Sequence, residues 1–316
     1  MNAIVTGGCG FIGYNLTQRL QSDGHTVTVI DNLSSGYRSN HVDKVDYHYI
    51  SIQKGIDQLV EMLKPDVIFH FAAIPRVTYS VEYPLKTTEE NVIMTVQLLD
   101  AVRRVSPATR IVYSSSSSIY GGMAGLPTKE SSPAAPQSPY AMQKWQGEEW
   151  VKLFANLYGL NAVILRYFNV FGPHSRYGGA YSTVLSAWLY STYVDQTVKP
   201  YLEGDGTQSR DFCFVDNVVD ANLAAADQGR IDPFRGEAYN IAQGQQHTLL
   251  DCKQIIEDIS GKKLDLEIRD PRVGDVPHTL ADITLAGRVL GYDPSSDFKN
   301  QLEQMAKWYE TDYPVA

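Results

Sequence analysis

The sequence predicts an α/β fold in which a doubly wound parallel sheet is joined to a smaller α/β unit. Short apolar runs rich in β-branched residues alternate with stretches of helical spacing through the first half of the 316 residues. Strands that alternate with helices favour a parallel sheet covered by helices on both faces. This alternation weakens after residue 171, which indicates a second unit. The expected strands are residues 3–6, 26–30, 67–71, 110–113, 162–167 and 237–241.

Two helices are expected between the early strands. In residues 13–21, Leu16 and Leu20 fall on one helical face, and residues 90–104 repeat apolar side chains at the same spacing. From residue 249 to the end, the pattern indicates a helix, a short strand and another helix.

These changes predict how the chain is divided. Residues 1–171 are expected to form the sheet unit, to which residues 213–245 return. Residues 172–212 and 246–316 are expected to form a discontinuous substrate-binding unit that covers the carboxyl edge of the sheet.

Composition excludes several classes of protein. A formal net charge of -9 argues against a nucleic-acid binder, and an anionic substrate would need locally placed Arg or Lys. Cys9, Cys213 and Cys252 form no CxxC pair and the seven His are scattered, so neither disulfides nor a metal site are expected. With no signal peptide and no apolar run of membrane-spanning length, we expect a cytoplasmic protein without a membrane partner.

A glycine-rich turn follows the first strand, where residues 7–13 read GGCGFIG. Gly7 suits a tight turn, Gly10 lets the backbone approach a pyrophosphate, and Gly13 lets helix and strand pack closely. The N-terminus of the following helix would direct N–H groups at the phosphates. Such a turn also occurs for packing alone, so its context has to support a dinucleotide site of Rossmann type.

Asp31 supplies that context, because it ends the second strand about twenty residues further on. A carboxylate there can accept hydrogen bonds from the adenine-ribose hydroxyls and would repel a 2′-phosphate. The expected cofactor is therefore NAD rather than NADP, although Arg38 could still contact a phosphate.

A phenol and an ammonium stand four residues apart at Tyr140 and Lys144, which places them on one face of a helix. A nearby ammonium and a cationic nicotinamide ring would both favour the phenolate and lower the pKa of the tyrosine toward a useful value. The spacing alone is common by chance and also fits a surface pair.

A run of serines gives the pair its context. Residues 114–118 directly follow the strand at 110–113, and the carboxyl end of a strand is where this fold binds ligands. A serine hydroxyl there could hydrogen-bond the substrate oxygen that loses its proton. The alternative is a merely polar loop.

Taken together, these residues resemble the nucleotide-sugar branch of the extended short-chain dehydrogenases/reductases, and specifically the UDP-glucose/UDP-N-acetylglucosamine 4-epimerases. The resemblance covers nearly the whole chain. Besides the glycine turn, it rests on residues 71–73 (FAA), Asn91, 114–121 (SSSSSIYG), 138–140 (SPY), 166–170 (RYFNV), 204–206 (GDG), 210–212 (RDF) and 274–276 (GDV).

The resemblance implies a role for each matching residue. It makes Ser116 the catalytic hydroxyl and Tyr140 the acid/base, and it lets Lys144 bind the nicotinamide ribose and tune Tyr140. The cofactor-binding residues that it implies are Gly7, Gly10, Phe11, Ile12, Gly13, Asp31, Asn32, Ser34, Gly36, Ser51, Ile52, Phe71, Ala72, Ala73, Asn91, Ser114, Tyr140, Lys144, Tyr167 and Val170. The substrate-binding residues are Ser116, Asn169, Thr183, Val184, Trp188, Tyr201, Glu203, Arg210, Arg272, Asp275 and Thr279, with hydrophobic packing an equal alternative for Trp188 and Tyr201.

One position departs from the family pattern. The family often has Asp where this chain has Ser51, so we expect a weaker or water-mediated contact to the adenine amine. Arg210 and Arg272 are expected at the diphosphate, since a guanidinium binds phosphate through two hydrogen bonds, and surface arginines are the alternative.

The residues after Ser116 bear on the reaction. Related 4,6-dehydratases carry Asp and Glu there, and related uronate decarboxylases carry Glu at the second position. This chain has Ser117 and Ser118, which cannot act as carboxyl acid/bases. The reaction that remains is reversible 4-epimerisation through a 4-keto sugar, with NAD as a tightly held prosthetic group.

Two positions bear on the sugar. Thr279 matches a place where enzymes restricted to unsubstituted hexoses carry Tyr, so an N-acetyl group should fit without excluding UDP-Glc and UDP-Gal. Arg176 lies near where uronate-acting relatives hold an Arg for the C6 carboxylate, so a UDP-uronate 4-epimerase is the main alternative. A non-catalytic NAD-binding protein is a further alternative, although such proteins usually lose the Tyr/Lys pair.

The family also implies a homodimer formed through two helices of each subunit. Leu153, Phe154 and Leu157 could contribute to that interface, although burial within the monomer explains them equally well.

Overall fold

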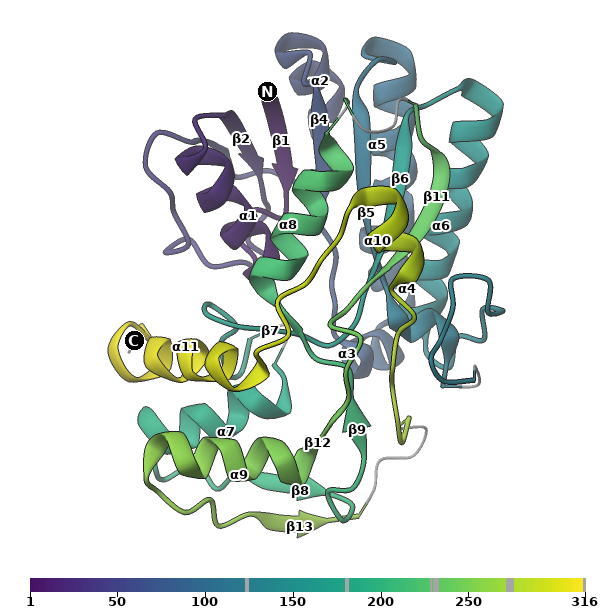
Figure 1. Cartoon of the computed structure of the whole chain (residues 1–316). Coiled ribbons are helices and arrows are strands. Elements are labelled where there is room, and N and C mark those ends of the chain that lie inside the picture. Colours follow the sequence, from purple (N-terminus) through teal and green to yellow (C-terminus); the bar gives the residue numbers. More distant parts are fainter. Residues whose placement is uncertain (123–124, 180–181, 228, 230–232, 271–275, 315–316) are drawn as a thin grey trace.

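A parallel sheet of seven strands is the centre of the computed structural model, which describes residues 1–122, 125–179, 182–227, 229, 233–270 and 276–314 (Figure 1). Each neighbouring pair of strands is parallel, and β1 lies between β2 and β4, so the chain reverses its direction of travel across the sheet there. This arrangement confirms the predicted doubly wound sheet. In order across the sheet the strands are β3 (Asp46–His48), β2 (Thr26–Ile30), β1 (Asn2–Thr6), β4 (Val67–His70), β5 (Arg110–Ser116), β6 (Ala162–Tyr167) and β11 (Arg235–Ile241).

Helices cover both faces of this sheet. Alternate strand residues enter two separate cores: Ala3 and Val5 pack on one face, whereas Ile4 packs on the other. The first face is covered by α1 (Phe11–Ser22), α8 (Val215–Ala226) and α10 (Thr284–Leu290), and the second by α2 (Ile56–Leu63), α5 (Met94–Val105) and α6 (Pro139–Tyr158).

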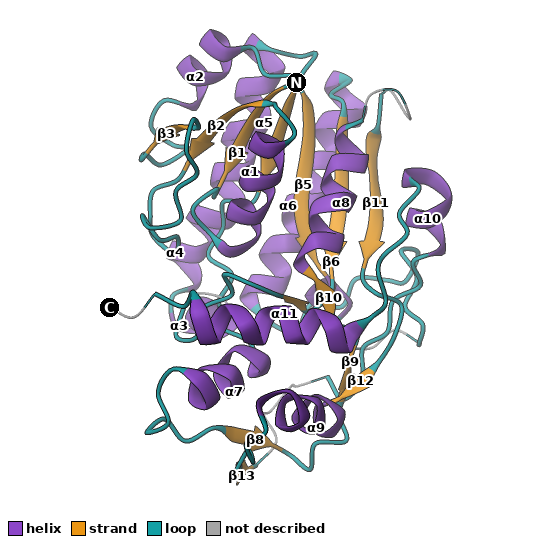
Figure 2. Ribbon diagram, turned by 60° about the vertical axis from the view of Figure 1, so that its left-hand side comes forward, coloured by secondary structure: helices purple, strands orange, loops and turns teal. Residues whose placement is uncertain are grey.

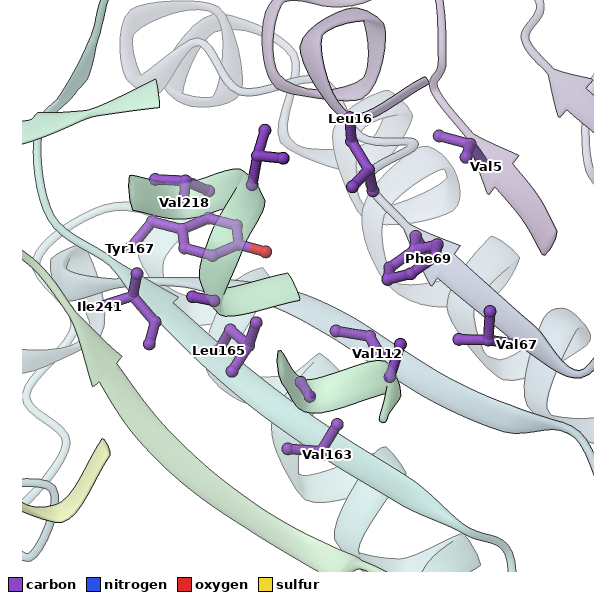
Figure 3. Packing of buried hydrophobic residues seen from close by; sticks show 14 of the residues in the cluster. Val5, Leu16, Val67, Phe69, Val112, Val163, Leu165, Tyr167, Val218 and Ile241 are labelled. Carbon is purple, nitrogen blue, oxygen red and sulfur yellow. The ribbon is translucent and has the colours of Figure 1, made fainter. Parts of the chain in front are cut away.

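The first core shows how the sheet is held. Figure 3 shows Val5, Phe69 and Leu165 of three strands gathered with Leu16 of α1 and Val218 of α8. Leu16 and Val5 have no exposed surface. The helical face predicted from Leu16 therefore packs on the sheet. This packing holds α1 against β1 and so fixes the position of the glycine turn that connects them.

The helix expected at residues 90–104 begins with an irregular turn. This is a π-helical turn, η1 (Glu89–Ile93), which leads directly into α5. Two short helices come before it, α3 (Val77–Glu82) and α4 (Pro84–Thr88). Pro84 occupies the first turn of α4, where its missing N–H costs nothing. Within the π turn, Asn91 accepts from the Ile74 N–H at 2.7 Å and donates to the Ile74 carbonyl at 3.1 Å. The irregular turn thus holds the loop after β4.

A group of smaller elements lies at the carboxyl edge of the sheet (Figures 1 and 2). Their side chains share a core that includes Trp188, Leu249 and Leu302. The division of the chain into two units stays a prediction, and α10, which falls in the range 246–316, packs against α8 and β11 on the sheet. The elements of this group are α7 (Val184–Tyr193), β8 (Tyr201–Glu203), α9 (Leu249–Ser260), β13 (Glu267–Arg269) and α11 (Phe298–Thr311).

Short paired strands connect this group to the sheet. β7 (Val170–Phe171) pairs with β10 (Cys213–Phe214), and β9 (Ser209–Arg210) pairs with β12 (His247–Thr248). A 3₁₀ turn, η2 (Ser117–Tyr120), follows β5. Within the described residues, no helix is both long enough and apolar enough to cross a lipid bilayer.

Candidate active site

A cavity of about 820 Å³ lies where the strands of the sheet end. It is lined by the glycine turn, by the residues that follow β2, β4 and β5, and by residues 276, 278 and 279. Ligands of open α/β sheets bind at the carboxyl ends of the strands, where the strand order reverses. The volume lies in the upper part of the range of about 300–1,000 Å³ that ligand pockets span.

The glycine turn brings the backbone close to this cavity. Gly7 has φ +73°, and a Cβ there would lie 2.8 Å from the Ala72 nitrogen. A Cβ on Gly13 would lie 2.3 Å from the Gly7 carbonyl oxygen, so that helix and turn could not approach as they do. The N-cap of α1 is Gly10, whose lack of a side chain leaves the first N–H groups of the helix uncapped by it. This turn therefore offers backbone donors to a phosphate.

Asp31 stands at the end of β2 and lines the cavity. Its carboxylate accepts from the Cys9 N–H at 2.9 Å and from the Leu33 N–H at 2.7 Å. Burial raises the pKa of Asp31, and the two backbone donors oppose that shift. The carboxylate is therefore held rigidly beside the glycine turn, where it could meet ribose hydroxyls and would repel a 2′-phosphate.

The serines, Tyr140 and Lys144 meet at the opposite wall. The strand β5 extends through Ser116, further than predicted, and Ser116 and Tyr140 both line the cavity there. Ser138 caps α6 by accepting from the Ala141 N–H at 3.2 Å, which sets Tyr140 in the first turn of the helix. One turn later, Lys144 donates from Nζ to the Ser114 carbonyl at 2.8 Å.

Burial controls the ionisation of this pair. It raises the pKa of Tyr140 to about 12, a shift that the nearby Ser116 side chain partly opposes. It also lowers the pKa of Lys144 to about 8, against the attraction of Glu148. Burial is the largest influence on the pKa of Tyr140, and the expectation that Lys144 and a cationic nicotinamide ring together lower this pKa stays a prediction. An ionised phenol at this position therefore needs further positive charge nearby, which the nicotinamide ring of an oxidised cofactor would supply.

A buried polar chain supports this wall from behind. The Glu148 carboxylate has no exposed surface and accepts from Arg166 Nε at 2.9 Å and Nη2 at 2.7 Å, and from the Ser115 hydroxyl. Arg166 Nη1 donates to the Tyr120 hydroxyl at 2.8 Å, and Tyr120 donates to Asn240 at 2.7 Å. Because Glu148 lies one turn after Lys144 on α6, the chain ties the helix to β5 and β6.

The remaining wall is built by residues far apart in sequence. Asn169, with φ +32°, donates from Nδ2 to the Thr279 hydroxyl at 3.1 Å and to the Asp211 carbonyl at 3.0 Å. The Thr279 hydroxyl also accepts from the Asp211 N–H at 3.0 Å. Arg210 lines the cavity beside them. The small side chain of Thr279 is therefore fixed in place.

Most of the residues expected at the site line this cavity. The exceptions among the expected cofactor residues are Gly36, which packs under the glycine turn, and Asn91, which holds the loop after β4. The expected residues that line the cavity are Gly7, Gly10, Phe11, Ile12, Gly13, Asp31, Asn32, Ser34, Ser51, Ile52, Phe71, Ala72, Ala73, Ser114, Ser116, Tyr140, Lys144, Tyr167, Asn169, Val170, Arg210 and Thr279.

Several expected substrate residues lie elsewhere. Trp188 is fully buried in the core of the smaller elements, and its Nε1 donates to the Tyr201 carbonyl at 3.0 Å, which favours the packing alternative. Thr183 caps α7 by accepting from the Ser186 N–H. Also outside the lining of the cavity are Val184, Tyr201 and Glu203. Arg272 and Asp275 lie outside the described residues.

Other residues line the cavity without having been singled out as site residues. Tyr120 and Gly121 belong to the serine-containing motif, so their place in that motif was the available signal. Phe168 likewise belongs to the motif at 166–170, whereas Tyr37 and Val77 also line the cavity and no local pattern marks them. Arg38 does not line it, because its guanidinium lies over the Tyr49 ring at 4.7 Å from the centroid.

Comparison with known proteins accounts for this geometry. Residues 3–242 match the NAD dependent epimerase/dehydratase family. The chain belongs to that family. A curated relative, the UDP-glucose 4-epimerase of Mycolicibacterium smegmatis, is 34% identical over 300 residues, which are 93% of this chain and 94% of the relative. The resemblance drawn from the motifs is confirmed.

Solved structures of relatives share the fold of this family member. The UDP-glucose 4-epimerase of Thermotoga maritima with UDP-glucose has a TM-score of 0.92 at 30% identity, covering 99% of this chain and 100% of that one. The UDP-N-acetylglucosamine 4-epimerase of Methanobrevibacter ruminantium has 0.90 at 34%, covering 98% and 97%. The UDP-glucuronic acid 4-epimerase of Bacillus cereus, with UDP-glucuronic acid and NAD, has 0.89 at 28%, covering 99% and 100%.

NAD is the cofactor of this family member, as predicted. The residues at the site fit it. The Gly13 position admits no Cβ where the turn meets the helix, and the carboxylate of Asp31 stands at the end of β2. The close packing of turn and helix lets the backbone approach a pyrophosphate, and the carboxylate of Asp31 suits the hydroxyls of an adenine ribose that carries no 2′-phosphate.

Proposed function

We propose that this chain catalyses the reversible 4-epimerisation of a UDP-sugar, UDP-GlcNAc/UDP-GalNAc and/or UDP-Glc/UDP-Gal, with NAD held as a prosthetic group. The observation that carries the proposal is the position of Tyr140 and Ser116 on one wall of a cavity whose other wall is the glycine turn. A phenol and a hydroxyl in that position suit the removal of a proton from a sugar hydroxyl.

Each residue of this wall has one task. Tyr140 takes the proton of the sugar 4-hydroxyl and later returns it, and Ser116 hydrogen-bonds the same oxygen. Bound NAD would supply the reversible hydride acceptor for C4. Between these events the 4-keto sugar turns about its link to the diphosphate and presents its other face. Lys144 holds positive charge beneath Tyr140 and anchors α6 to Ser114.

The serines after Ser116 favour this reaction over elimination or decarboxylation. Ser117 and Ser118 line the cavity, and neither can act as a carboxyl acid/base. The retained Tyr140 and Lys144 argue against a non-catalytic NAD-binding protein. The diphosphate is assigned to Arg210 and to Arg272, with Asp275 near the nucleotide ribose, on the strength of the family resemblance.

The choice of sugar rests on Thr279. Its short side chain lines the cavity, and its hydroxyl is held by Asn169 and Asp211, so the space beside it stays open. We therefore expect both N-acetylhexosamines and hexoses to be accepted. The UDP-uronate alternative draws support from the relative of B. cereus, which is a UDP-glucuronic acid 4-epimerase, and it rests on Arg176 in this chain.

NMR of three separate reactions tests the function. UDP-Glc, UDP-GlcNAc and UDP-GlcA are each incubated with the purified protein without added NAD. We expect inversion at C4 for UDP-GlcNAc and UDP-Glc. Loss of water or of carbon dioxide would contradict the epimerase proposal, and inversion of UDP-GlcA alone would replace the proposed substrates.

Replacing Thr279 by tyrosine in the same assay tests the sugar pocket. We expect Thr279→Tyr to lower conversion of UDP-GlcNAc relative to UDP-Glc by about 10- to 200-fold, since filling a pocket changes selectivity by about 1–3 kcal/mol. Thr279→Ser is the control, because it keeps the hydroxyl that accepts from Asn169 and Asp211. Equal losses on both sugars in Thr279→Tyr would show that Thr279 does not limit the C2 substituent.

We also propose that the protein is a homodimer whose interface includes α6. Trp150, Leu153 and Leu157 form a stripe at helical spacing on α6, and their exposed fractions are 37%, 47% and 63%. Phe154 lies instead in the core of its own subunit, where it is 6% exposed. An exposed apolar stripe of this kind favours a contact with a second copy.

A charge placed in this stripe should separate the subunits. We expect light scattering to give the mass of a dimer for the unmodified protein and a monomer for Leu157→Glu at micromolar concentration, because the new carboxylate would be desolvated in the interface. Met62→Glu changes a similarly exposed side chain on α2 and should leave the dimer intact. A dimer of unchanged affinity in Leu157→Glu would exclude this face.

A further inference from the structure

Arg176 bonds to the loop after β2, which lies beside the glycine turn. Its Nη2 donates to the Ser39 hydroxyl at 3.0 Å and to Asn40 Oδ1 at 2.9 Å, and its guanidinium carbon lies 4.0 Å from the centroid of the Tyr37 ring. Asn40 and Tyr37 in turn donate to the Cys9 carbonyl, at 2.9 and 3.0 Å. Arg176 is therefore connected, through one residue on either side, to the turn that precedes α1.

The residues before Arg176 pack directly on the first turns of α1. Asn15 donates to the Pro173 carbonyl at 3.3 Å, and the His174 ring lies against Tyr14 with the ring centroids 4.5 Å apart. The segment 173–176 thus runs across the start of the helix whose uncapped N–H groups face the cavity. Arg176 lines that same cavity.

The guanidinium has an unused donor. Arg176 Nε is buried and donates to no group in the described part of the chain, and Arg176 forms no ion pair there. Burial lowers the pKa of Arg176, and the groups that offset this are the phenols of Tyr14, Tyr37, Tyr309 and Tyr313. A half-buried cation without a carboxylate is costly unless an anion pairs with it.

The partners of Arg176 lie away from the reacting carbon of the sugar. Ser116 and Tyr140 mark that position at the end of β5, whereas Tyr37, Ser39 and Asn40 follow β2. In the sheet, β5 and β2 are separated by β4 and β1. The loop after β2 returns to the glycine turn that follows β1, because Tyr37 and Asn40 donate to the Cys9 carbonyl, and β1 lies two strands from β5. The bonds of Arg176 to this loop favour the glycine turn over a C6 carboxylate beside Ser116 and Tyr140 as the place where it acts.

We propose that Arg176 binds the pyrophosphate of the bound dinucleotide and that, with Tyr37 and Asn40, it fastens the segment 173–179 over the cofactor. A guanidinium stacked on an aromatic ring is pre-oriented and can direct its remaining N–H groups at phosphate oxygens. The proposal rests on the NAD site alone and does not depend on which UDP-sugar is the substrate. It assigns to the cofactor an arginine that the sequence linked to the sugar.

The NAD content of purified variants tests this assignment directly. The variants are Arg176→Met and Arg176→Lys, with Arg38→Met as the matched control in the neighbouring loop, since Arg38 lies over Tyr49 and outside the cavity. Bound NAD is released by acid and counted per subunit, and the affinity for added NAD is measured by calorimetry after the bound NAD has been removed. Loss of one charge-assisted contact should weaken NAD binding about 10- to 100-fold in Arg176→Met, with partial recovery in Arg176→Lys. Arg38→Met should match the unmodified protein.

The ratio of UDP-GlcA to UDP-Glc turnover distinguishes the two assignments of Arg176. With saturating NAD, we expect this ratio to stay unchanged in Arg176→Met. Full NAD content in Arg176→Met, with or without a selective loss of UDP-GlcA turnover, would overturn the proposal. If Arg176→Met does not fold, the NAD affinity of Arg176→Lys decides, because an affinity equal to that of the unmodified protein would also overturn it. Absence of turnover on all UDP-sugars, combined with weaker NAD binding in the variants, would refute the proposed function and leave this inference standing.

Discussion

Replacing Tyr140 by phenylalanine is expected to lower turnover of the UDP-sugar by about 10²- to 10⁴-fold, which is the usual contribution of a positioned acid/base. The hydroxyl is the only group removed. Its ring stays in the first turn of α6, which Ser138 caps and Lys144 holds to β5. Because burial and not an ion pair governs the phenol, the variant leaves no buried charge unpaired. We therefore expect the fold and the bound NAD to be retained.

Single-turnover reduction of bound NAD, followed at 340 nm, separates this prediction from a loss of binding. Tyr140→Phe should retain NAD at the level of the unmodified protein and show the decrease in the rate of the chemical step. Tyr79→Phe is the control, because Tyr79 lies on the nearby α3 but does not line the cavity. A turnover rate within threefold of the unmodified protein for Tyr140→Phe would remove Tyr140 from the role of acid/base.

The part of the site that the sequence predicts is the part governed by local chemistry. Gly7 and Gly13 are required by a positive φ and a close approach within one turn, and Asp31 follows the next strand. Tyr140 and Lys144 share a helical face whatever surrounds the helix. These features depend on neighbours in sequence, and each can be seen in the printed chain.

The part that the sequence does not predict depends on packing between distant segments. Trp188 was an equal candidate for binding and for packing, and only the elements around α7 show that it is buried. Arg176 bonds to Asn40, 136 residues away, and no pattern in the sequence marks that pair. The desolvation that raises the pKa of Tyr140 likewise arises from residues brought together by the fold.

Replacing Glu148 by glutamine is expected to destabilise the protein by about 3–5 kcal/mol, since it leaves the buried Arg166 charge without its partner. Arg166 is 6% exposed and gives two of its donors to this carboxylate. The variant has nearly the same shape as the original, so the loss reflects charge and hydrogen bonding. Glu149→Gln is the control on the same helix. There the carboxylate pairs with Lys152 at 2.7 Å in an exposed position, and its loss should cost about 0–1 kcal/mol.

The pH dependence of this loss identifies the link to Lys144. Burial lowers the pKa of Lys144 from 10.5 to about 8 against the opposing attraction of Glu148, so Glu148→Gln should lower this pKa further. In the unmodified protein, between about pH 8 and 10.5, Lys144 is protonated in the unfolded state and largely neutral in the folded state. The free energy of unfolding therefore rises with pH across that window. In Glu148→Gln the folded-state pKa of Lys144 is lower, so the window begins at lower pH and Lys144 reduces the stability of the variant more than that of the unmodified protein at pH 7. The deficit measured by urea unfolding should therefore be larger at pH 7 than at pH 9.

Combining Glu148→Gln with Arg166→Met shows where the energy lies. If the cost comes from an unpaired buried charge, the double variant should lose less stability than the two single variants together, because neither charge is then left alone. An additive loss, or a Glu148→Gln variant as stable as Glu149→Gln, would contradict this account. The apolar contacts of α6 would then have to position Lys144 and Tyr140. In that case, the pH above which turnover declines should be the same in Glu148→Gln and in the unmodified protein.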